Sequence, residues 1–494
     1  MSPILVVSVI LAYFLLLVVI SRWTSRGAST NTFFTGDRQS HWFLVAFGMI
    51  GTSLSGITFI SVPGAVWNSG MGYFQVVLGY ILGYLVIAKV LMPIYYRMNV
   101  VSIYEYLLDR FGIVSHKTGA AIFILSRTLG SAMRLYLATN VLQYFLFDPL
   151  NIPYWVTALV SITLIWVYTN KGGIKTIVIT DTIQTFFLIA SVILCGIIIL
   201  NQLDLSIPEL YERIGQTEHD GKSIRQFFFW DDPLSKSYFP KQFFGGMFLA
   251  IVMTGLDQDL MQKNLTCRNL KEAQKNVYTF TSILVVVNLI FLILGGALYV
   301  YAQEKGIELP RLTDGSINTD SVFPSLAFDD FGVVAGIFFL LGIIAASYSS
   351  SDSALAALTT GFCIDFLRFK ERSDEKEKAR LKRITHLGFS LIFLIIVIVT
   401  HSLQASSLIT LILQLAAYTY GPLLGLFAFG IFTKRKLKDQ LVPIICVLIP
   451  TLCYLLSQYS STLLFGYQFS YEILILNGLL TFIGLWIISE KSTS

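Results

Sequence analysis

Charged residues are scarce in this sequence. Only 13% of its 494 residues are Asp, Glu, Lys or Arg, whereas 55% are hydrophobic. An average soluble domain carries about 25% charged residues. The composition therefore excludes an ordinary soluble enzyme and is typical of a protein that crosses a lipid bilayer many times.

Motifs for several kinds of chemistry are also missing. The five cysteines form neither a C-x-x-C motif nor a Cys/His cluster, which argues against a disulfide framework and a zinc site. No G-x-x-x-x-G-K-[S/T] phosphate loop and no H-E-x-x-H motif occurs. We therefore predict no enzyme activity, no cofactor and no ATP-driven transport by this chain alone.

Long apolar stretches are abundant. A helix that spans a bilayer needs about 20 mainly apolar residues. We find thirteen such stretches, at 2–21, 42–63, 73–96, 119–145, 152–169, 176–200, 242–262, 276–301, 330–364, 385–401, 405–431, 440–458 and 468–489. The first is too long for a signal peptide and lacks a small-residue cleavage site, so we count it as a span. The prediction is an all-α polytopic membrane protein.

Basic residues indicate the orientation, because they favour the cytoplasmic side of a membrane. With the N-terminus outside, the inner segments hold 25 of the 35 Lys and Arg residues, including Lys263 and eight residues in 368–383. The seven outer ones all lie in the long loops 201–241 and 302–329. We predict a cell-membrane protein with a cytoplasmic C-terminus. The net charge of +5 then reflects topology, not nucleic-acid binding, and no obligate protein partner is implied.

Two predicted spans are interrupted by glycine and polar residues. Span 2 contains Gly48, Gly51 and Gly56 among hydroxyls, and span 7 contains Gly255 followed by Asp257 and Gln258. Any one small residue is also explained by close helix packing. Two interrupted spans five apart indicate an inverted-repeat transporter with a binding site near the membrane midplane. The repeats would be spans 2–6 (about 42–200) and 7–11 (about 242–431), with spans 1, 12 and 13 peripheral in a single domain.

The ninth span carries a run of hydroxyls and one carboxylate. Helical spacing places Ala346, Ser349, Ser350 and Ser353 on one stripe, with Asp352 at its edge. Mostly neutral oxygen ligands suit a monovalent cation. Ionisable side chains inside a membrane usually mark ion or proton pathways, and Asp352 requires a partner.

The other charges within spans leave alternatives open. They are Lys89, Arg127, Arg134, Asp181 and Asp257. Asp181 lies either at the cytoplasmic interface or in the interior. Arg127 and Arg134 share one face of span 4, where they either receive an anionic solute or pair with carboxylates of neighbouring spans.

Four segments resemble the sodium:solute symporter family, which has a leucine-transporter-like fold of two inverted five-helix repeats. They are "SIYEYLLDRFG" after span 3, "GGIKTIVITDTIQTFF" at span 6, "GLDQDLMQKNLTCRNLKEAQK" leaving span 7 and "AASYSSSDSALAALTTGFCIDF" in span 9. The resemblance covers nearly the whole chain.

The resemblance implies two cation sites. The shared sodium site would use the carbonyls of Gly51, Leu54 and Ala346 and the hydroxyls of Ser349 and Ser350. A second site, present in some members, would lie at Asp181, Ser349, Asp352 and Ser353. This sequence departs from the family pattern, in which a hydroxyl or alanine is usual where Asp352 stands. Two carboxylates around one monovalent cation would leave a net negative charge, so either Asp352 is protonated, a proton replaces sodium, or an arginine pairs with it.

The segment "TSLSGITFISVPG" in span 2 is similar to members that carry sialic acid, in which Ser53, Ser55 and Thr58 would contact the solute. An arginine of span 4 holds the substrate carboxylate in those members. Arg134 lies on that span, about one turn from the expected place. Further polar candidates are Gln75, which is alternatively an outer-interface residue, Asp257 and Gln258.

These observations predict a sodium-coupled symporter that imports a small polar organic solute, with Na⁺ as the coupling ion. A carboxylated sugar such as sialic acid, or another organic anion, is favoured. A neutral sugar, polyol or amino acid is the alternative solute. A channel or a non-transporting membrane sensor with the same fold is the alternative of another class.

Overall fold

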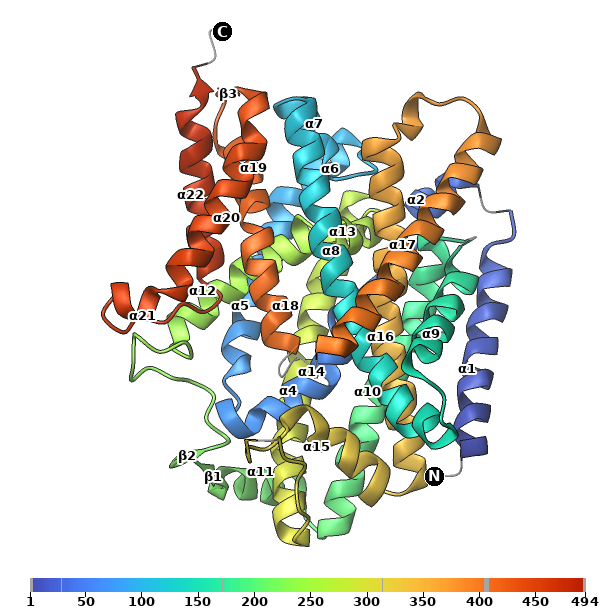
Figure 1. Ribbon diagram of the computed structural model, residues 1–494, viewed down its shortest axis with the longest axis vertical. Helices are drawn as coiled ribbons and strands as arrows, with labels where there is room; N and C mark the ends of the chain where they lie inside the picture. Colours follow the sequence, from blue (N-terminus) through green and yellow to red (C-terminus); the bar gives the residue numbers. More distant parts are fainter. Residues whose placement is uncertain (1–2, 28, 171, 313, 404–407, 492–494) are drawn as a thin grey trace.

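The protein is a helical bundle (Figure 1). The computed structural model describes residues 3–491 except 28, 171, 313 and 404–407. In its first half the helices are α1 (Pro3–Thr24), α2 (Thr30–Thr35), α3 (Trp42–Ser53), α4 (Gly56–Ser69), α5 (Tyr73–Val86), α6 (Met92–Met98), α7 (Glu105–Arg110), α8 (Ile113–Leu142), α9 (Tyr154–Thr169), α10 (Ile174–Leu203) and α11 (Ile207–Gln216). Helices suit a chain in lipid because each satisfies its own backbone hydrogen bonds.

The second half is also helical. Its helices are α12 (Phe239–Ala250), α13 (Gln258–Asn264), α14 (Leu270–Lys305), α15 (Thr319–Ser325), α16 (Val333–Gly361), α17 (Glu375–Leu403), α18 (Leu408–Thr419), α19 (Gly421–Phe432), α20 (Val442–Gln458), α21 (Ser460–Leu463) and α22 (Ile473–Ile487). Two short antiparallel ribbons pair β1 (Glu218–His219) with β2 (Lys222–Ser223) and β3 (Lys436–Leu437) with β4 (Ser489–Glu490).

Each of the thirteen predicted spans falls on a helix or a pair of consecutive helices, as far as its residues are described; residue 2 of the first span and residues 405–407 of the eleventh lie outside the described residues. By length and composition, eight helices of the described chain qualify as membrane spans, and ten do so if each of two bent pairs counts as one. Helices α9 and α22 are apolar but shorter. Helix α8 has 30 residues and carries Arg127 and Arg134. The predicted all-α membrane architecture is confirmed.

The two bent pairs are the two spans that the sequence predicts to be interrupted. Helices α3 and α4 meet at 60°, and the segment from α12 to Gly255 meets α13 at 70°. Gly56 opens α4 directly against Ser347, leaving no room there for a Cβ atom. Asp257 begins α13 by accepting a hydrogen bond from the Asp259 backbone N–H (2.8 Å).

The predicted inner and outer segments lie at opposite ends of the bundle. Helices α2 and α7 and strand β3 lie toward one end of its long axis, whereas α11, β1, β2 and α15 lie toward the other (Figure 1). The separation agrees with the predicted alternation of loops. Which end faces the cytoplasm stays a prediction.

Helix α16 lies in the interior of the bundle. Its side chains from Leu340 to Gly361 are all buried, and α3, α4, α8 and α10 pack around it. The hydroxyl run therefore faces protein and not lipid, as expected for polar groups within a membrane span.

Candidate substrate cavity and cation site

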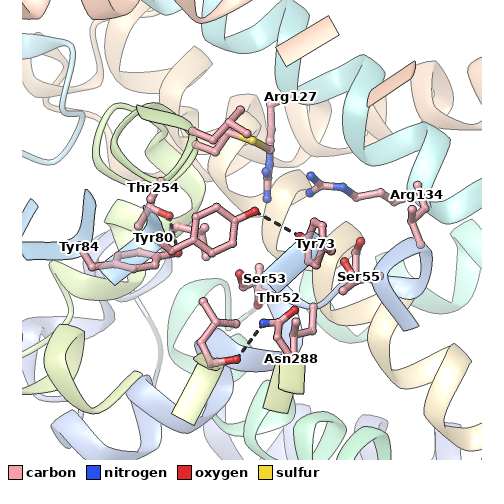
Figure 2. Close-up of a pocket in the computed structure, with 18 residues that line it drawn as sticks. Thr52, Ser53, Ser55, Tyr73, Tyr80, Tyr84, Arg127, Arg134, Thr254 and Asn288 are labelled. Carbon is pink, nitrogen blue, oxygen red and sulfur yellow. Dashed lines mark hydrogen bonds between the residues drawn. The ribbon is translucent and has the colours of Figure 1, made fainter. Parts of the chain in front are cut away.

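A cavity lies beside the break between α3 and α4 (Figure 2). Its other walls come from α5, α8, α12, α13, α14 and the turn that follows α12. The polar residues that line it are Thr52, Ser53, Ser55, Thr58, Tyr73, Tyr80, Tyr84, Arg127, Arg134, Thr254 and Asn288. The break matters because it exposes a short stretch of hydroxyls that a continuous helix would pack against its neighbours.

Four of the seven predicted solute contacts line this cavity. They are Ser53, Ser55, Thr58 and Arg134. The structure places Gln75, Asp257 and Gln258 outside the cavity lining, each with protein partners of its own.

Gln75 connects α5 to the long loop before α12. Its Nε2 donates to the Ser237 carbonyl (3.1 Å), and its Oε1 accepts from the Phe229 N–H (3.1 Å). Gln75 therefore holds this loop against α5, and whether this end of the bundle faces outside stays a prediction. Gln258 holds the segment before α7 by bonding the Val101 carbonyl (2.8 Å) and the Ile103 N–H (2.9 Å).

Arg127 is paired with carboxylates. Its Nη2 donates to Asp259 Oδ2, and its Nη1 lies 3.8 Å from Asp257 Oδ2. The Tyr420 hydroxyl also donates to Asp257, and Ser353 donates to Asp259. Of the two alternatives for Arg127, the structure shows the ion pair. This network joins α8, α13, α16 and α19 at one side of the cavity.

Arg134 lies two turns further along α8 and is partly exposed to the cavity. No carboxylate of the described residues lies within ion-pair distance of it, and none of them forms a hydrogen bond with it. Figure 2 shows the guanidinium groups of Arg127 and Arg134 pointing toward the same space beside Tyr73. Asp257 and Asp259 both contact Arg127, so Arg134 is the arginine at the cavity wall that no described carboxylate contacts.

Several residues of the lining were not predicted from the sequence. Tyr73, Tyr80 and Tyr84 all reach the cavity from α5, and Asn288 reaches it from α14. The three tyrosines could have been predicted together from the sequence, because positions seven and eleven residues after Tyr73 share its helical face. The Asn288 amide oxygen has no hydrogen-bond partner within the described part of the chain.

The predicted sodium ligands lie where α3 ends against α16. Helix α3 stops at Ser53 and α4 starts at Gly56, so the carbonyls of Gly51 and Leu54 accept no backbone hydrogen bond among the described residues. A Cβ atom at Gly51 would stand 3.3 Å from Ser349 Oγ, which brings the two chains into close contact. Ser350 Oγ is buried and finds no partner in the residues that the structure describes.

The four residues predicted for a second cation are not all in contact. Ser349 Oγ donates to Asp181 Oδ1 (2.7 Å), so these two lie together and Asp181 is an interior residue. Ser353 instead bonds Asp259. Asp352 accepts from the Tyr168 hydroxyl (2.7 Å), and its other oxygen has no partner in the described chain. No arginine of the described residues pairs with Asp352.

A lysine lies at the predicted second cation site, beside Asp181. The Lys263 ammonium donates to Asp181 Oδ2 and to Thr52 Oγ1. The charge pattern predicts Lys263 to be one of the cytoplasmic charges, but its side chain is only 1% exposed. The reason is the 70° bend before α13, which directs this short helix across the bundle and not out of it. In the sequence, the i to i+4 spacing of Asp259 and Lys263 indicates that the two side chains share a helical face, and this is what could have suggested that Lys263 points into the bundle as Asp259 does.

The apolar helices, the two broken spans and the internal cavity with buried charges define a multi-pass membrane transporter and not an enzyme. The chain belongs to the sodium:solute symporter family, whose family model matches residues 33–439. It is a sodium-coupled solute symporter. The predicted family, fold and transporter class are thereby confirmed.

Similar proteins include the sodium/sialic acid symporter SiaT of Proteus mirabilis, 26% identical over 90% of this chain and 87% of the relative. The sodium/sialic acid symporter NanT of Aliivibrio fischeri is 26% identical over 83% of this chain and 79% of the relative. The sodium-coupled monocarboxylate transporter 2 of Bos taurus is 26% identical over 82% of this chain and 64% of the relative.

The fold is also that of a solved structure. A Na⁺-coupled sialic acid symporter, with substrate bound in an outward-open state, superimposes with a TM-score of 0.83. The match covers 98% of this chain and 99% of the solved one, at 21% sequence identity. At that identity the match establishes the leucine-transporter-like fold alone.

Proposed function

We propose that this symporter imports a small organic anion together with sodium across the cell membrane, with the N-terminus outside and the C-terminus in the cytoplasm. A carboxylated sugar such as sialic acid is the favoured solute. The observation that carries the proposal is the guanidinium of Arg134 at the cavity wall, which no carboxylate of the described residues contacts. A buried or half-buried charge without a counter-ion is costly, and a bound anion removes that cost.

The chemistry of the cavity supports a carboxylate with hydroxyl groups. Arginine presents paired N–H donors that match the two oxygens of a carboxylate. Ser53, Ser55 and Thr58, together with the tyrosines of α5, offer hydroxyls that both donate and accept hydrogen bonds. The solutes named for the sialic acid and monocarboxylate transporters above are acids.

The proposed sodium site joins α3 to α16. Its ligands are the carbonyls of Gly51, Leu54 and Ala346 and the hydroxyls of Ser349 and Ser350. Sodium bound there would hold the break of the α3/α4 span against α16, and the same break forms a wall of the solute cavity. Sodium and solute then raise each other's affinity by the same factor.

Uptake by purified protein in proteoliposomes tests this function. N-acetylneuraminate and lactate serve as acidic probes, and glucose and proline serve as neutral ones. We expect saturable uptake of an acid that increases with an inward sodium gradient. Sodium-driven uptake of the neutral probes alone would overturn the anion proposal. Flux without saturation or gradient dependence would indicate a channel, and solute binding without uptake a sensor.

A further inference from the structure

Lys263 brings a positive charge to the place where the resemblance implies a second cation. Its ammonium contacts Asp181 Oδ2 and Thr52 Oγ1. Thr52 Oγ1 in turn lies 3.1 Å from Ser349 Oγ and donates to Asp181 Oδ2 (3.2 Å). The carboxylate and the two hydroxyls are oxygen ligands that a monovalent cation would take, and the ammonium already donates to the carboxylate and to the Thr52 hydroxyl.

The position of Lys263 couples both broken spans. Lys263 lies in the last turn of α13, which belongs to the second broken span. Thr52 lies in the last turn of α3, just before the break of the first broken span. Asp181 stands on α10, which packs against α3 and α16. The ammonium therefore lies at the junction of the helices that build the proposed sodium site and the cavity.

We infer that Lys263 is a tethered cation which occupies the Asp181 position and excludes a second sodium ion, so that one sodium ion accompanies each solute. This inference rests on the proposed sodium site at Ser349 and Ser350. Asp181 and Lys263 form a neutral pair. A sodium ion added to the same carboxylate would compete with the ammonium for Asp181 Oδ2, and two like charges side by side in a fully buried place repel each other strongly.

No other nearby carboxylate of the described residues contacts the Lys263 ammonium and draws it away from Asp181. Asp352, the carboxylate of the hydroxyl run, accepts a hydrogen bond from the Tyr168 hydroxyl and not from Lys263. Asp259 is taken by Arg127. Among the described residues, Asp181 is the only carboxylate that contacts Lys263, and losing the ammonium would leave Asp181 open to another cation.

Counting bound sodium on the full-length protein tests the inference. Equilibrium binding of ²²Na⁺ to purified protein, without solute, is expected to give one ion per chain. Lys263→Gln is expected to bind one additional ion, because Asp181 becomes free. Lys263→Arg keeps a cation and is expected to bind as many ions as the natural protein. The double change Lys263→Gln with Asp181→Asn should remove the additional ion.

Lys376→Gln serves as the matched control, since Lys376 is exposed in the first turn of α17 and its loss should change nothing. Lys263→Met is the second variant if Lys263→Gln does not fold, as judged by size-exclusion chromatography. Two ions on the natural protein, or no additional ion on a folded variant without the ammonium, would overturn the inference.

The two proposals fail in different ways. If the natural protein binds no sodium but Lys263→Gln binds one ion, the sodium site at Ser350 is wrong and the tethered cation stands. If both proteins bind none, both proposals fall. The natural protein alone decides between one ion and two even if every variant misfolds.

Discussion

Consecutive serines of α16 have different partners. Ser349 Oγ donates to Asp181, and Ser351 Oγ donates to the Ser347 carbonyl within the helix (2.8 Å). Ser350 Oγ, between them, is fully buried and bonds to none of the described residues. A buried hydroxyl without a protein partner has paid a desolvation cost, and a sodium ion bound at this position would compensate for it.

We therefore predict that Ser350→Ala weakens sodium binding without weakening the fold. The change removes a cation ligand but breaks no hydrogen bond to a described residue. The loss of about 1–2 kcal/mol should raise the sodium concentration for half-maximal uptake by roughly five-fold or more. Ser351→Ala is the control, because it removes a hydroxyl of equal burial that bonds only its own helix. An unchanged sodium dependence in Ser350→Ala would refute the sodium site.

Arg134 and Arg127 share a helix but differ in their partners, and this separates their expected roles. Arg134→Gln should lower the uptake of an acidic solute at least ten-fold and leave protein yield unchanged, since no described carboxylate loses a partner. Initial uptake rates in proteoliposomes measure this. Lys89→Gln is the control, because Lys89 is an exposed basic residue away from the cavity lining. Normal uptake of the acid by Arg134→Gln would place the carboxylate elsewhere.

The break between α3 and α4 is the element that connects the two proposed sites. One side of it carries the free carbonyls of Gly51 and Leu54, and the other side carries hydroxyls of the cavity lining. Gly56 lies against α16 because its missing side chain leaves space for the Ser347 hydroxyl. The packing of this element on α16 therefore depends on two small residues.

This packing predicts a pair of compensating changes. Gly56→Ala should lower the melting temperature and sodium-dependent uptake, because the new methyl group would overlap Ser347 Oγ. Ser347→Ala alone should be tolerated, since that hydroxyl has no partner among the described residues. The double variant should recover much of the loss, because only the Ser347 Cβ, at 3.2 Å, then remains close.

Gly64→Ala provides the contrast for that test. Its new methyl group would meet the backbone carbonyl of Thr319, which no side-chain change removes. If Ser347→Ala fails to improve Gly56→Ala in both melting and uptake, contact between α4 and α16 is not what limits the variant.

For the whole molecule, the number of ions sets how far a solute can be accumulated. Each charge that crosses about 100 mV contributes roughly 2.3 kcal/mol, and a tenfold sodium gradient adds about 1.4 kcal/mol. One sodium ion would then concentrate a neutral solute by about 500-fold. A solute with one negative charge cancels the electrical term, which leaves about tenfold accumulation.

We therefore predict that uptake of a monovalent acid is electroneutral. Potentials set with potassium and valinomycin should leave its steady-state accumulation unchanged at a fixed sodium gradient. If Lys263→Gln transports a second sodium ion, its accumulation should increase at inside-negative potential. Potential-dependent accumulation by the natural protein would contradict either the single ion or the anionic solute, and ²²Na⁺ counting separates the two.

Much of the fold follows from the sequence because the bilayer restricts it. Apolar runs of about 20 residues allow little besides helices, and the predicted spans all fall on helices. Glycine clusters marked the breaks at Leu54 and before Asp257, because small residues and adjacent polar groups are what an interrupted span requires. Periodicity also placed Ser349 and Ser350 on one stripe of α16, which the structure buries.

The pairing of charges did not follow from the sequence. Arg127 and Arg134 have the same chemistry and the same helical face, yet only Arg127 meets Asp259. Lys263 directly follows a predicted span, where a cytoplasmic loop was the ordinary expectation. Distances between side chains on different helices depend on the bend angles and on how the spans pack, and neither is encoded in local periodicity.

The sequence by itself determined the lipid environment, the helical spans, the two breaks and the family, because these depend on hydrophobicity, local propensity and short motifs. The tertiary structure alone decided which charges meet. It placed the Lys263 ammonium on Asp181, left Arg134 at the cavity without a contact to a described carboxylate, and placed the Tyr168 hydroxyl on Asp352. Electrostatic interactions act between residues far apart in the chain, so only the packed helices determine which site retains a charge for a solute or an ion.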